Sequence, residues 1–353
     1  MTAVHVIVPE GLDDPARPSG GNAYDRRVCS GLDACGWSVH ERAVPGSWPR
    51  PDASARAALV GVLTELPDGA VVLIDGLVAC DVPEVLVPEA ARLCLVVLLH
   101  MPLGERAAGD PVVRSRECAV LAAAAAVVTT SVWSRCWLLE HYALIPDRVH
   151  VAAPGVDATD PAPGTPMGGE LLCVAAVVPD KGYDVLVAAL AEITDLTWAC
   201  VCVGSLTRDP GFVEHLLGQC RDSAVEDRIT FTGPRSGGAL TASYAAADLL
   251  VLPTRSESFG MVVPEALARG LPVIATSVGG VPEALGQLPD GSRPGLLVPP
   301  GDVAALATAL RRWLGDVELR QALRQVARQR RTLLAGWDVT ASRLCRVLTE
   351  VAG

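Results

Sequence analysis

The chain has 353 residues, of which 50% are hydrophobic and 20% charged, and its formal net charge is −11. This acidic balance argues against nucleic acid as the main partner, because phosphate backbones are bound by basic surfaces. No apolar run reaches the ~18 residues of a membrane span, and the first residues carry neither a basic region nor a cleavage site, so we expect a cytoplasmic protein without integral membrane contact.

Short apolar runs alternate with helical patterns through the first half of the chain, which predicts a parallel sheet with crossover helices. Helices are expected at residues 22–35 and 53–66, and the alanine-rich stretch 119–128 predicts a buried helix that runs into a strand. The predicted strands are residues 4–9, 38–43, 71–75, 93–100, 126–130 and 150–152.

A linker is predicted at residues 158–169. Three prolines and three glycines in twelve residues cannot extend a helix or a central strand. We therefore expect an N-terminal domain at residues 1–157 and a second domain at residues 170–336, with a ligand cleft between two such α/β halves.

The alternation of strands and helices restarts after this linker. Helices are predicted at residues 183–193 and 303–314 and over 317–351, and residues 337–353 form a terminal helix. The predicted strands are residues 170–177, 198–204, 229–232, 249–253, 273–275 and 295–298.

The eleven cysteines lie mostly inside apolar runs. Neither Cys200 nor Cys202 has the neighbouring cysteine or histidine that would complete a tetrahedral metal site. We expect buried reduced thiols and no metal site.

The most informative stretch is residues 253–275. A predicted strand ends at Pro253, a loop carries Glu257, and a helix is expected from Gly260 to Gly270, with Pro264 in its first turn. The amides at the start of this helix predict an anion site, formed by Gly260, Met261, Val262 and Val263.

Glu257 and Glu265 are eight positions apart, so they would not share one face of a continuous helix. With Glu257 in the loop, the two carboxylates can reach separate hydroxyl groups of one extended ligand. Each carboxylate accepts up to about four hydrogen bonds, which suits vicinal diols.

At these residues the sequence resembles the retaining family-4 glycosyltransferases, whose E-x7-E motif is matched by Glu257 and Glu265. The resemblance extends over nearly the whole chain. Further matches in the family's order are Gly20-Gly21, His100, residues 154–157, residues 179–182 with Lys181, residues 279–283, and Trp337.

The resemblance implies a GT-B fold, in which two Rossmann-like doubly wound domains face a cleft and the C-terminal helix packs back toward the first domain. The second domain would bind a nucleotide sugar, UDP- or GDP-linked. A small hydrophilic acceptor would bind on the side of the first domain.

The resemblance also implies roles for individual residues. Glu257 would hold hydroxyls of the donor sugar, and His100 would lie beside the reacting carbon, so both are the catalytic candidates. The implied donor-binding residues are Glu265 at the ribose, Lys181 at the diphosphate, Gly20 and Gly21 near the phosphates, and Arg255, Phe259, Gly260, Met261 and Val262 around the loop.

The expected chemistry uses no metal and no cofactor beyond the nucleotide sugar as co-substrate. The chain contains no D-x-D, the sequence with which many glycosyltransferases bind a metal. Helix amides and a lysine can oppose the charge on the departing phosphate, and one such donor can be worth ~3 to 4 kcal/mol of barrier. The family is thought to retain configuration by front-face attack.

One departure from the family pattern concerns the diphosphate. Ala176 stands where the family has an arginine five residues before the lysine. A charged hydrogen bond contributes ~1.5 to 3 kcal/mol, so donor binding would weaken unless another cation replaces it. Arg255 is the first candidate, and Arg208 and Arg235 are the others.

Simpler readings of single residues remain open. Glu265 could complement a helix dipole, His100 could be a satisfied histidine at the end of a strand, and Lys181 could be a solvated lysine. Asp75 could meet the acceptor or cap a helix.

The rival functions are a GT-B sugar-nucleotide epimerase or hydrolase and, from another class, a two-lobed sugar-binding protein. A dinucleotide-dependent oxidoreductase is disfavoured because no G-x-G-x-x-G follows a strand.

Overall fold

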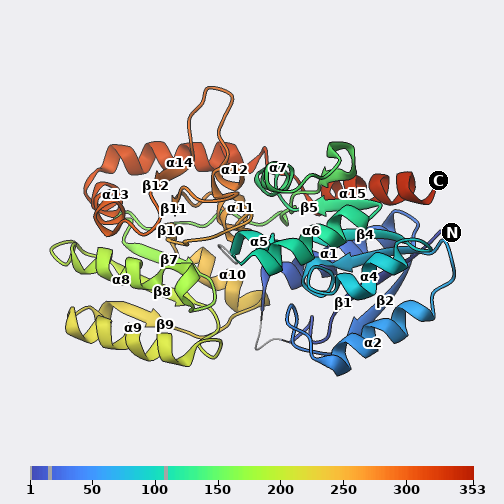
Figure 1. The fold of residues 1–353 in the computed structure, drawn as a ribbon. Coiled ribbons are helices and arrows are strands. Elements are labelled where there is room, and N and C mark those ends of the chain that lie inside the picture. Colours follow the sequence, from blue (N-terminus) through green and yellow to red (C-terminus); the bar gives the residue numbers. More distant parts are fainter. Residues whose placement is uncertain (1, 15–17, 107–109) are drawn as a thin grey trace. The chain divides into compact units, whose positions relative to one another are not determined.

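The computed structural model describes residues 2–14, 18–106 and 110–353, which form two compact units (Figure 1). The first unit is drawn from Met1–Asp13, Ser19–Gly155 and Ala335–Gly353, and the second mainly from Val156–Leu334. Each unit is built around one six-stranded parallel sheet.

The first sheet has the strand order β2-β1-β3-β4-β5-β6, and every pair is parallel. All six predicted strands are present, with ends shifted by one residue at most. Their bounds are β1 Ala3–Pro9, β2 Ser38–Val44, β3 Val71–Asp75, β4 Cys94–Leu99, β5 Ala126–Thr129 and β6 Val149–Val151.

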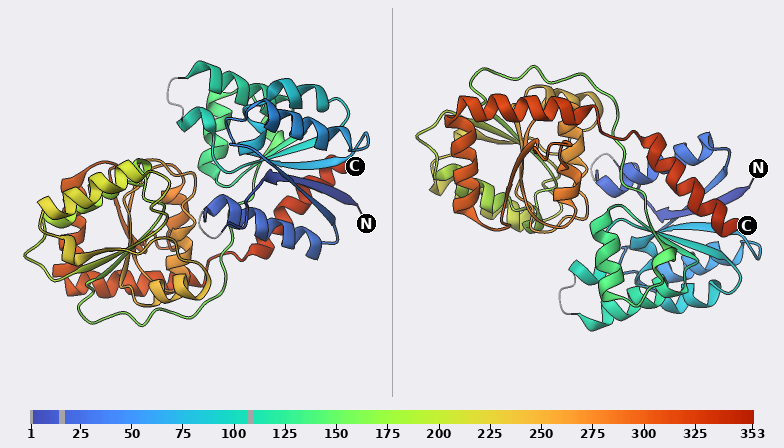
Figure 2. Two further views of the ribbon diagram at one scale, coloured as in Figure 1. Left: turned by 90° about the horizontal axis from the view of Figure 1, so that it is seen from below. Right: turned by 90° about the horizontal axis from the view of Figure 1, so that it is seen from above.

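Helices cover both faces of the first sheet. On one face α1 (Gly20–Ala34) packs against α15 (Trp337–Ala352), as both views of Figure 2 show. The contact is close, since a Cβ added to Gly31 would lie 2.4 Å from the Cβ of Ala341. The predicted return of the terminal helix to the first domain is thereby confirmed.

The other face of the first sheet carries the main apolar core, which Leu59, Leu86 and Leu138 enter from three different helices. The alanine-rich stretch forms a helix that leads into β5, as predicted. The remaining elements of this unit are α2 Ala53–Thr64, α3 Gly76–Ala79, α4 Pro83–Glu89, α5 Leu103–Arg106, α6 Pro111–Ala123, α7 Val132–His141 and the 3₁₀ helix η1 Pro146–Arg148.

The second sheet has the order β12-β11-β10-β7-β8-β9 and is also parallel throughout. The first strand ends three residues earlier than predicted, because the chain turns toward a 3₁₀ helix that begins at Pro179. The strands are β7 Glu170–Val174, β8 Ala199–Val203, β9 Ile229–Phe231, β10 Leu249–Leu252, β11 Val273–Thr276 and β12 Gly295–Val298.

Two layers of helices enclose the second sheet. Helices α8, α9 and α13 pack over one face, where Tyr183, Leu216 and Trp313 are buried in a common core, whereas α11 contacts α12 and α14. The bounds are α8 Tyr183–Ala191, α9 Pro210–Asp222, α10 Gly237–Ala245, α11 Val262–Ala268, α12 Val281–Leu285, α13 Val303–Gly315, α14 Val317–Arg331, and the 3₁₀ helices η2 Pro179–Lys181 and η3 Glu226–Arg228.

The helical pattern predicted over residues 317–351 is two helices rather than one. Helix α14 ends at Arg331 with Thr332 as its C-cap, and α15 begins at Trp337 after Gly336. The interruption coincides with the passage from the second unit to the first.

The proline-rich segment 158–169 contains neither helix nor strand, but it is tied to the second unit. The carboxylate of Asp248 is fully buried and accepts hydrogen bonds from the backbone and hydroxyl of Thr165 and from the guanidinium of Arg324. Arg331 donates to the carbonyl of Thr159. The segment therefore follows the second unit along most of its length.

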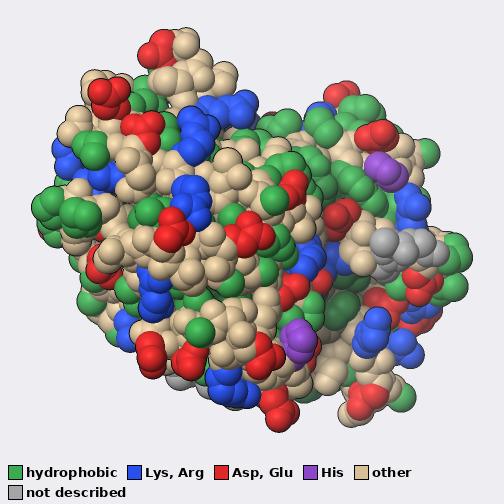
Figure 3. All heavy atoms as spheres, turned by 90° about the vertical axis from the view of Figure 1, so that its left-hand side faces the viewer, with side chains coloured by type: hydrophobic (Ala, Val, Ile, Leu, Met, Phe, Trp, Pro, Cys, Tyr) green, Lys and Arg blue, Asp and Glu red, His purple; other side chains and the backbone are tan. Residues whose placement is uncertain are grey.

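Cys200 and Cys202 lie in β8 and are 1% exposed, as expected for core thiols. None of the helices in residues 2–14, 18–106 and 110–353 combines the length and the apolar character needed to cross a bilayer. On the face drawn in Figure 3, acidic and basic side chains are interspersed.

Candidate functional site

The topological switch point of the second sheet lies between β7 and β10. The chain leaves β7 toward β8 and β9 on one side and then returns to place β10 on the other. In open α/β sheets, the loops that leave the carboxyl ends of the strands at such a point diverge and form a ligand-binding crevice. Here those two loops carry Lys181 and Glu257.

Backbone contacts hold these two loops together. The amide of Arg255 donates to the carbonyl of Asp180 at 2.7 Å. Gly182 has a φ of +69°, and a Cβ at this position would lie 2.0 Å from the carbonyl oxygen of Pro253. Only glycine can occupy this turn without displacing Pro253, which directly follows β10, so packing fixes the turn beside Lys181.

Lys181 and Glu257 form a direct ion pair. The ammonium Nζ lies 2.6 Å from Oε2 of Glu257, and the side chains are 27% and 20% exposed. An ammonium has three donors and a carboxylate about four acceptor positions, so each group can keep this bond and still bind a ligand.

Lys181 is also the only lysine in the 353 residues, and the other 28 of the 29 basic side chains are arginines. Because the composition is so strongly biased to arginine, the single lysine is a sequence signal that points to this position. The sequence interpretation did not use it.

A third loop, which follows β11, meets the loop of Glu257. The amide of Gly280 donates to the carbonyl of Glu257 at 3.0 Å. A Cβ on Gly279 would lie 1.8 Å from the same carbonyl oxygen, so the glycine pair at 279–280 permits a close approach of two backbones.

The helix after Glu257 begins later than predicted. Helix α11 starts at Val262, and Gly260 lies outside it with a φ of +86°. The amide of Val263 donates to the carbonyl of Gly260 at 2.9 Å, so the expectation that this amide is open to an anion is wrong. Pro264 is the third residue of α11, within the first turn as predicted.

Phe259 and Gly260 are buried, while Met261 and Val262 are half-buried. A Cβ on Gly260 would approach Cγ of Glu257 to 3.3 Å. The loop is thus folded closely around the Glu257 side chain.

Glu265 is held by an aromatic hydroxyl. The hydroxyl of Tyr244 donates to Oε2 of Glu265 at 2.7 Å, and the guanidinium of Arg269 lies 4.5 Å from the centre of the Tyr244 ring. Burial raises the pKa of Glu265, an effect that Tyr244 and Arg269 partly oppose. This carboxyl has specific partners, beyond a helix dipole alone.

Arg255 is engaged with another carboxylate. Its guanidinium forms two hydrogen bonds with Asp184, at 2.8 and 2.6 Å, and a third with the carbonyl of Pro179. The pKa of Asp184 is lowered, chiefly by its hydrogen bonds to Arg255. The charge expected to replace the arginine missing at Ala176 is therefore largely balanced within the protein.

The other two candidates for that replacement have partners as well. Arg208 donates to the carbonyl of Pro18 at 3.1 Å. Arg235 donates to the hydroxyl of Ser243 at 2.8 Å.

The first sheet has its own switch point, between β1 and β3. Gly20 and Gly21 begin α1, and the hydroxyl of Ser19 caps this helix by accepting from the amide of Asn22. A Cβ on Gly21 would lie 3.4 Å from Cδ2 of His100, so the two predicted site residues are neighbours.

His100 directly follows β4 and lies against two buried carboxyl groups. Its Nε2 is 2.8 Å from Oδ1 of Asp25 and 3.9 Å from Oδ2 of Asp75, and the ring of Tyr24 meets it edge-on. Burial disfavours the charged ring, but Asp25 and then Asp75 outweigh it and raise the pKa of His100 to about 9.

Asp75 fills one of the two roles considered for it, the capping of a helix. Its Oδ1 accepts from the amide of Leu77 at 2.6 Å and so caps α3. Burial and the neighbouring Asp25 raise the pKa of Asp75 to about 7. Asp25, in α1, was missed by the sequence interpretation because it matches no motif.

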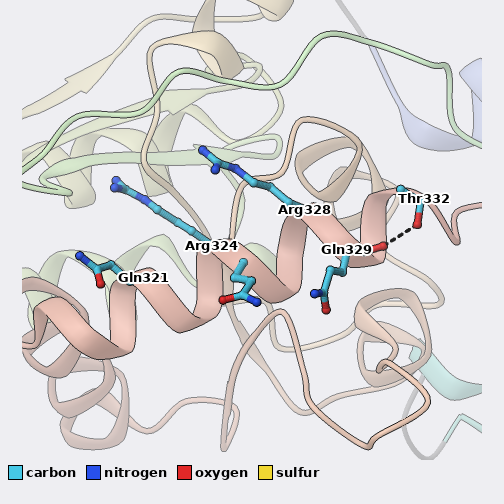
Figure 4. Close-up of a pocket in the computed structure, with 6 residues that line it drawn as sticks. Gln321, Arg324, Arg328, Gln329 and Thr332 are labelled. Atoms are coloured by element: carbon cyan, nitrogen blue, oxygen red, sulfur yellow. Dashed lines mark hydrogen bonds between the residues drawn. The ribbon is translucent and has the colours of Figure 1, made fainter.

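The predicted site residues thus form two groups, one in each unit. A separate groove of about 670 Å³ follows α14 and contains none of them. Residues of α14 and its C-cap line this groove, and Figure 4 shows Arg324 and Arg328 projecting from α14 toward the same side. We assign the candidate site to the loops at the carboxyl ends of the strands, where charged groups converge.

Comparisons with known proteins show what the chain is similar to. Residues 168–316 match the family described as "Glycosyl transferases group 1". This part of the chain is similar to that family, and the match lies within the second unit. The similarity agrees with the resemblance to glycosyltransferases inferred from the sequence.

Related sequences carry glycosyltransferase names. The D-inositol 3-phosphate glycosyltransferase of Salinispora arenicola is 35% identical over 238 residues, which cover 60% of this chain and 52% of the relative. That of Corynebacterium glutamicum is 33% identical over 234 residues, covering 60% and 54%. The chain spans about half the length of the curated relatives it matches.

Solved structures match the whole fold. Sucrose-phosphate synthase from Thermosynechococcus elongatus superposes with a TM-score of 0.79 at 22% identity and 99% coverage of both chains. Anabaena HepE in complex with UDP and glucose gives 0.78 at 19% identity, with 99% of this chain and 100% of that chain covered. The predicted GT-B fold of two Rossmann-like domains is confirmed.

Proposed function

We propose that the chain transfers a hexose from a UDP- or GDP-linked sugar to a small hydrophilic acceptor, with retention of configuration and without a metal ion. The observation that carries this proposal is the Lys181–Glu257 pair, which lies at the switch point of the second sheet within the residues that are similar to glycosyl transferases group 1.

The pair matches the charges of such a donor. The Lys181 ammonium would bind the diphosphate and oppose the charge that develops as it departs, which is the stage at which a preorganised cation lowers the barrier. Glu257 would accept hydrogen bonds from hydroxyls of the sugar. Because the two groups are bonded to each other, they would align the sugar and the diphosphate at neighbouring positions.

Glu265 would bind the ribose hydroxyls of the nucleotide. Tyr244 occupies one carboxyl oxygen and leaves the other for the ligand. A ribose presents two adjacent hydroxyl donors, and the remaining acceptor positions of the Glu265 carboxylate can accept hydrogen bonds from both.

In the first unit, His100 would contact the donor sugar, and Gly20 and Gly21 would admit the phosphates near the start of α1. The acceptor is proposed to bind on this unit. The names of the relatives make a phosphorylated cyclitol one acceptor to test first.

Calorimetric titration with UDP, GDP, UDP-glucose, GDP-mannose and NAD tests the donor. We expect binding of one nucleotide sugar and its diphosphate, and no binding of NAD. Tight NAD binding without a response to UDP or GDP would contradict the proposal.

Mass spectrometry of a small-molecule extract incubated with the donor tests transfer. A new glycoside is expected, with the anomeric configuration of the donor by NMR and unchanged yield in EDTA. Release of free sugar or of an epimer without any glycoside would identify the rival epimerase or hydrolase. Binding without any reaction would identify a sugar-binding protein.

A further inference from the structure

The cluster of Asp25, Asp75 and His100 in the first unit contains two buried carboxyl groups against one imidazole. One ligand-type atom from each residue lies within 4.8 Å of the other two. The carboxyl groups are 2% and 5% exposed, so neither has bulk water to stabilise a charge. Two adjacent carboxylates in such surroundings require compensating positive charge or protons.

The arrangement indicates where those protons are. Oδ1 of Asp25 bonds to Nε2 of His100, whereas Oδ2 of Asp25 is buried and has no hydrogen-bond partner among the described residues. A proton retained on Asp75 would provide a donor toward the neighbouring Asp25 carboxylate, and the burial-raised pKa of Asp75 favours such a proton. One ionised carboxylate, one neutral carboxyl and one imidazolium give a neutral buried cluster.

We propose that Asp25 is a positioning residue that keeps His100 doubly protonated, so that Nδ1 of His100 donates a hydrogen bond to an anionic oxygen of the bound ligand. In a neutral ring bonded to Asp25 through Nε2–H, Nδ1 would be an acceptor instead. The cation reverses that polarity and favours a phosphate oxygen over a hydroxyl hydrogen. This inference deepens the proposed function and rests on it for the place of His100 beside the ligand.

The surroundings of His100 support the assignment. The groups that face the ring are Asp25 and Tyr24 from α1 and Asp75 from the end of β3. The Tyr24 hydroxyl donates to the carbonyl of Ala152, so it does not compete for the ring nitrogens. No group of the described residues bonds to Nδ1, which leaves this nitrogen for a ligand.

NMR of the full chain labelled at histidine tests the protonation state. The His100 signal, assigned with His100→Gln, is expected to titrate near pH 9 in the natural sequence. Asp25→Asn should move the midpoint to about 6.5 or below, which lowers the protonated fraction at pH 7.5 about tenfold. Asp33→Asn, an exposed aspartate of the same helix, is the matched control and should leave the midpoint unchanged.

The source of the anionic oxygen is tested by adding UDP, GDP or inorganic phosphate to the same sample. A shift of the His100 ring with a nucleotide diphosphate alone identifies the donor. A shift with inorganic phosphate alone identifies a phosphorylated acceptor. Either result supports the inference, and no shift with any of these anions would overturn it.

The pH dependence of kcat distinguishes the proposed role of Asp25 from a purely structural one. Asp25→Asn should lower kcat at least about tenfold more at pH 8 than at pH 6, and Asp25→Glu should restore part of the loss. In the His100→Gln background Asp25→Asn should have no further pH-dependent effect. An additional loss there would contradict action through His100.

Two results separate this inference from the proposed function. A His100 midpoint near 9 that Asp25→Asn lowers, in a chain without transferase activity, would retire the proposed function and leave the protonation assignment intact. An ordinary midpoint in an active transferase would overturn the assignment alone. A stoichiometric metal in the purified chain that Asp25→Asn abolishes would also overturn it, because the cluster would then be a metal site.

Discussion

The two units have the same architecture, but they balance charge at the carboxyl ends of their strands in opposite ways. In the second unit one cation, Lys181, meets one carboxylate, Glu257, at a partly exposed site. In the first unit two carboxyl groups meet one histidine in a buried site. The partly exposed pair is electrically neutral as it stands, whereas the buried cluster must take up protons to become neutral. We therefore expect the stability of the first unit to depend on pH. The charge pair of the second unit should act mainly through its affinity for the ligand.

The dependence of stability on pH is the strongest test of this difference. The pKa of His100 is raised to about 9, so its contribution to stability is fully present below about 6.5 and is lost as the pH rises through 9. The free energy of unfolding of the first unit should fall by about 3 kcal/mol over this interval.

Thermal unfolding between pH 6 and 9.5 measures this effect. Asp25→Asn should flatten the pH dependence, whereas Asp33→Asn should preserve it. A chain whose stability is constant from pH 6.5 to 9 would show that the two units do not differ in this respect.

Replacement of Lys181 tests the ligand response of the second unit. Lys181→Ala should raise the Kd for the nucleoside diphosphate about ten- to a hundredfold, because a charged hydrogen bond is lost. Affinity for the nucleoside alone should change less than about twofold, by calorimetry. Arg311→Ala, an exposed cation of the same unit, is the control. Equal loss for nucleoside and diphosphate would remove Lys181 from the phosphate site.

Replacement of Glu265 should have a smaller effect. Glu265→Gln keeps the shape of the side chain but weakens its hydrogen bonds to the ribose, so nucleotide affinity should fall about tenfold. Affinity for inorganic pyrophosphate should not change, and the exposed Glu214→Gln serves as the control. A loss shared by pyrophosphate would place Glu265 elsewhere.

Arg255→Ala should have the smallest effect, because Asp184 already balances the guanidinium. We expect a loss of diphosphate affinity below about fivefold and, since the pair is partly exposed, a stability change below about 1 kcal/mol. Arg311→Ala breaks a similar bidentate pair with Asp195 and should match it in stability. If Arg255→Ala equals Lys181→Ala in binding, then Arg255 does replace the arginine missing at Ala176.

These contrasts also show which parts of the molecule could be predicted from the sequence. All twelve strands were predicted, because apolar runs bounded by turn residues are a local signal. The motif loops of Lys181 and Glu257 were found because their residues are contiguous. Helix α11 was predicted to start too early because the φ of Gly260 depends on its tertiary contacts.

The partners of the site residues could not be predicted. Asp25 and His100 are 75 positions apart, and Tyr244 and Glu265 belong to different helices. No periodic pattern links such residues, since their contact results from the order of the strands. The charge balance of Arg255 was missed for the same reason.

The solitary lysine makes the cleavage of these 353 residues by a lysine-specific protease a probe of one place in the fold. A lysine-specific protease has one peptide bond to cut, Lys181–Gly182, and that bond lies in a turn packed against Pro253. A protease requires an extended substrate, so cleavage must wait for local opening of the second unit. The rate of cleavage at this bond would therefore report how often the second unit opens locally. A ligand that stabilises the turn would lower that rate.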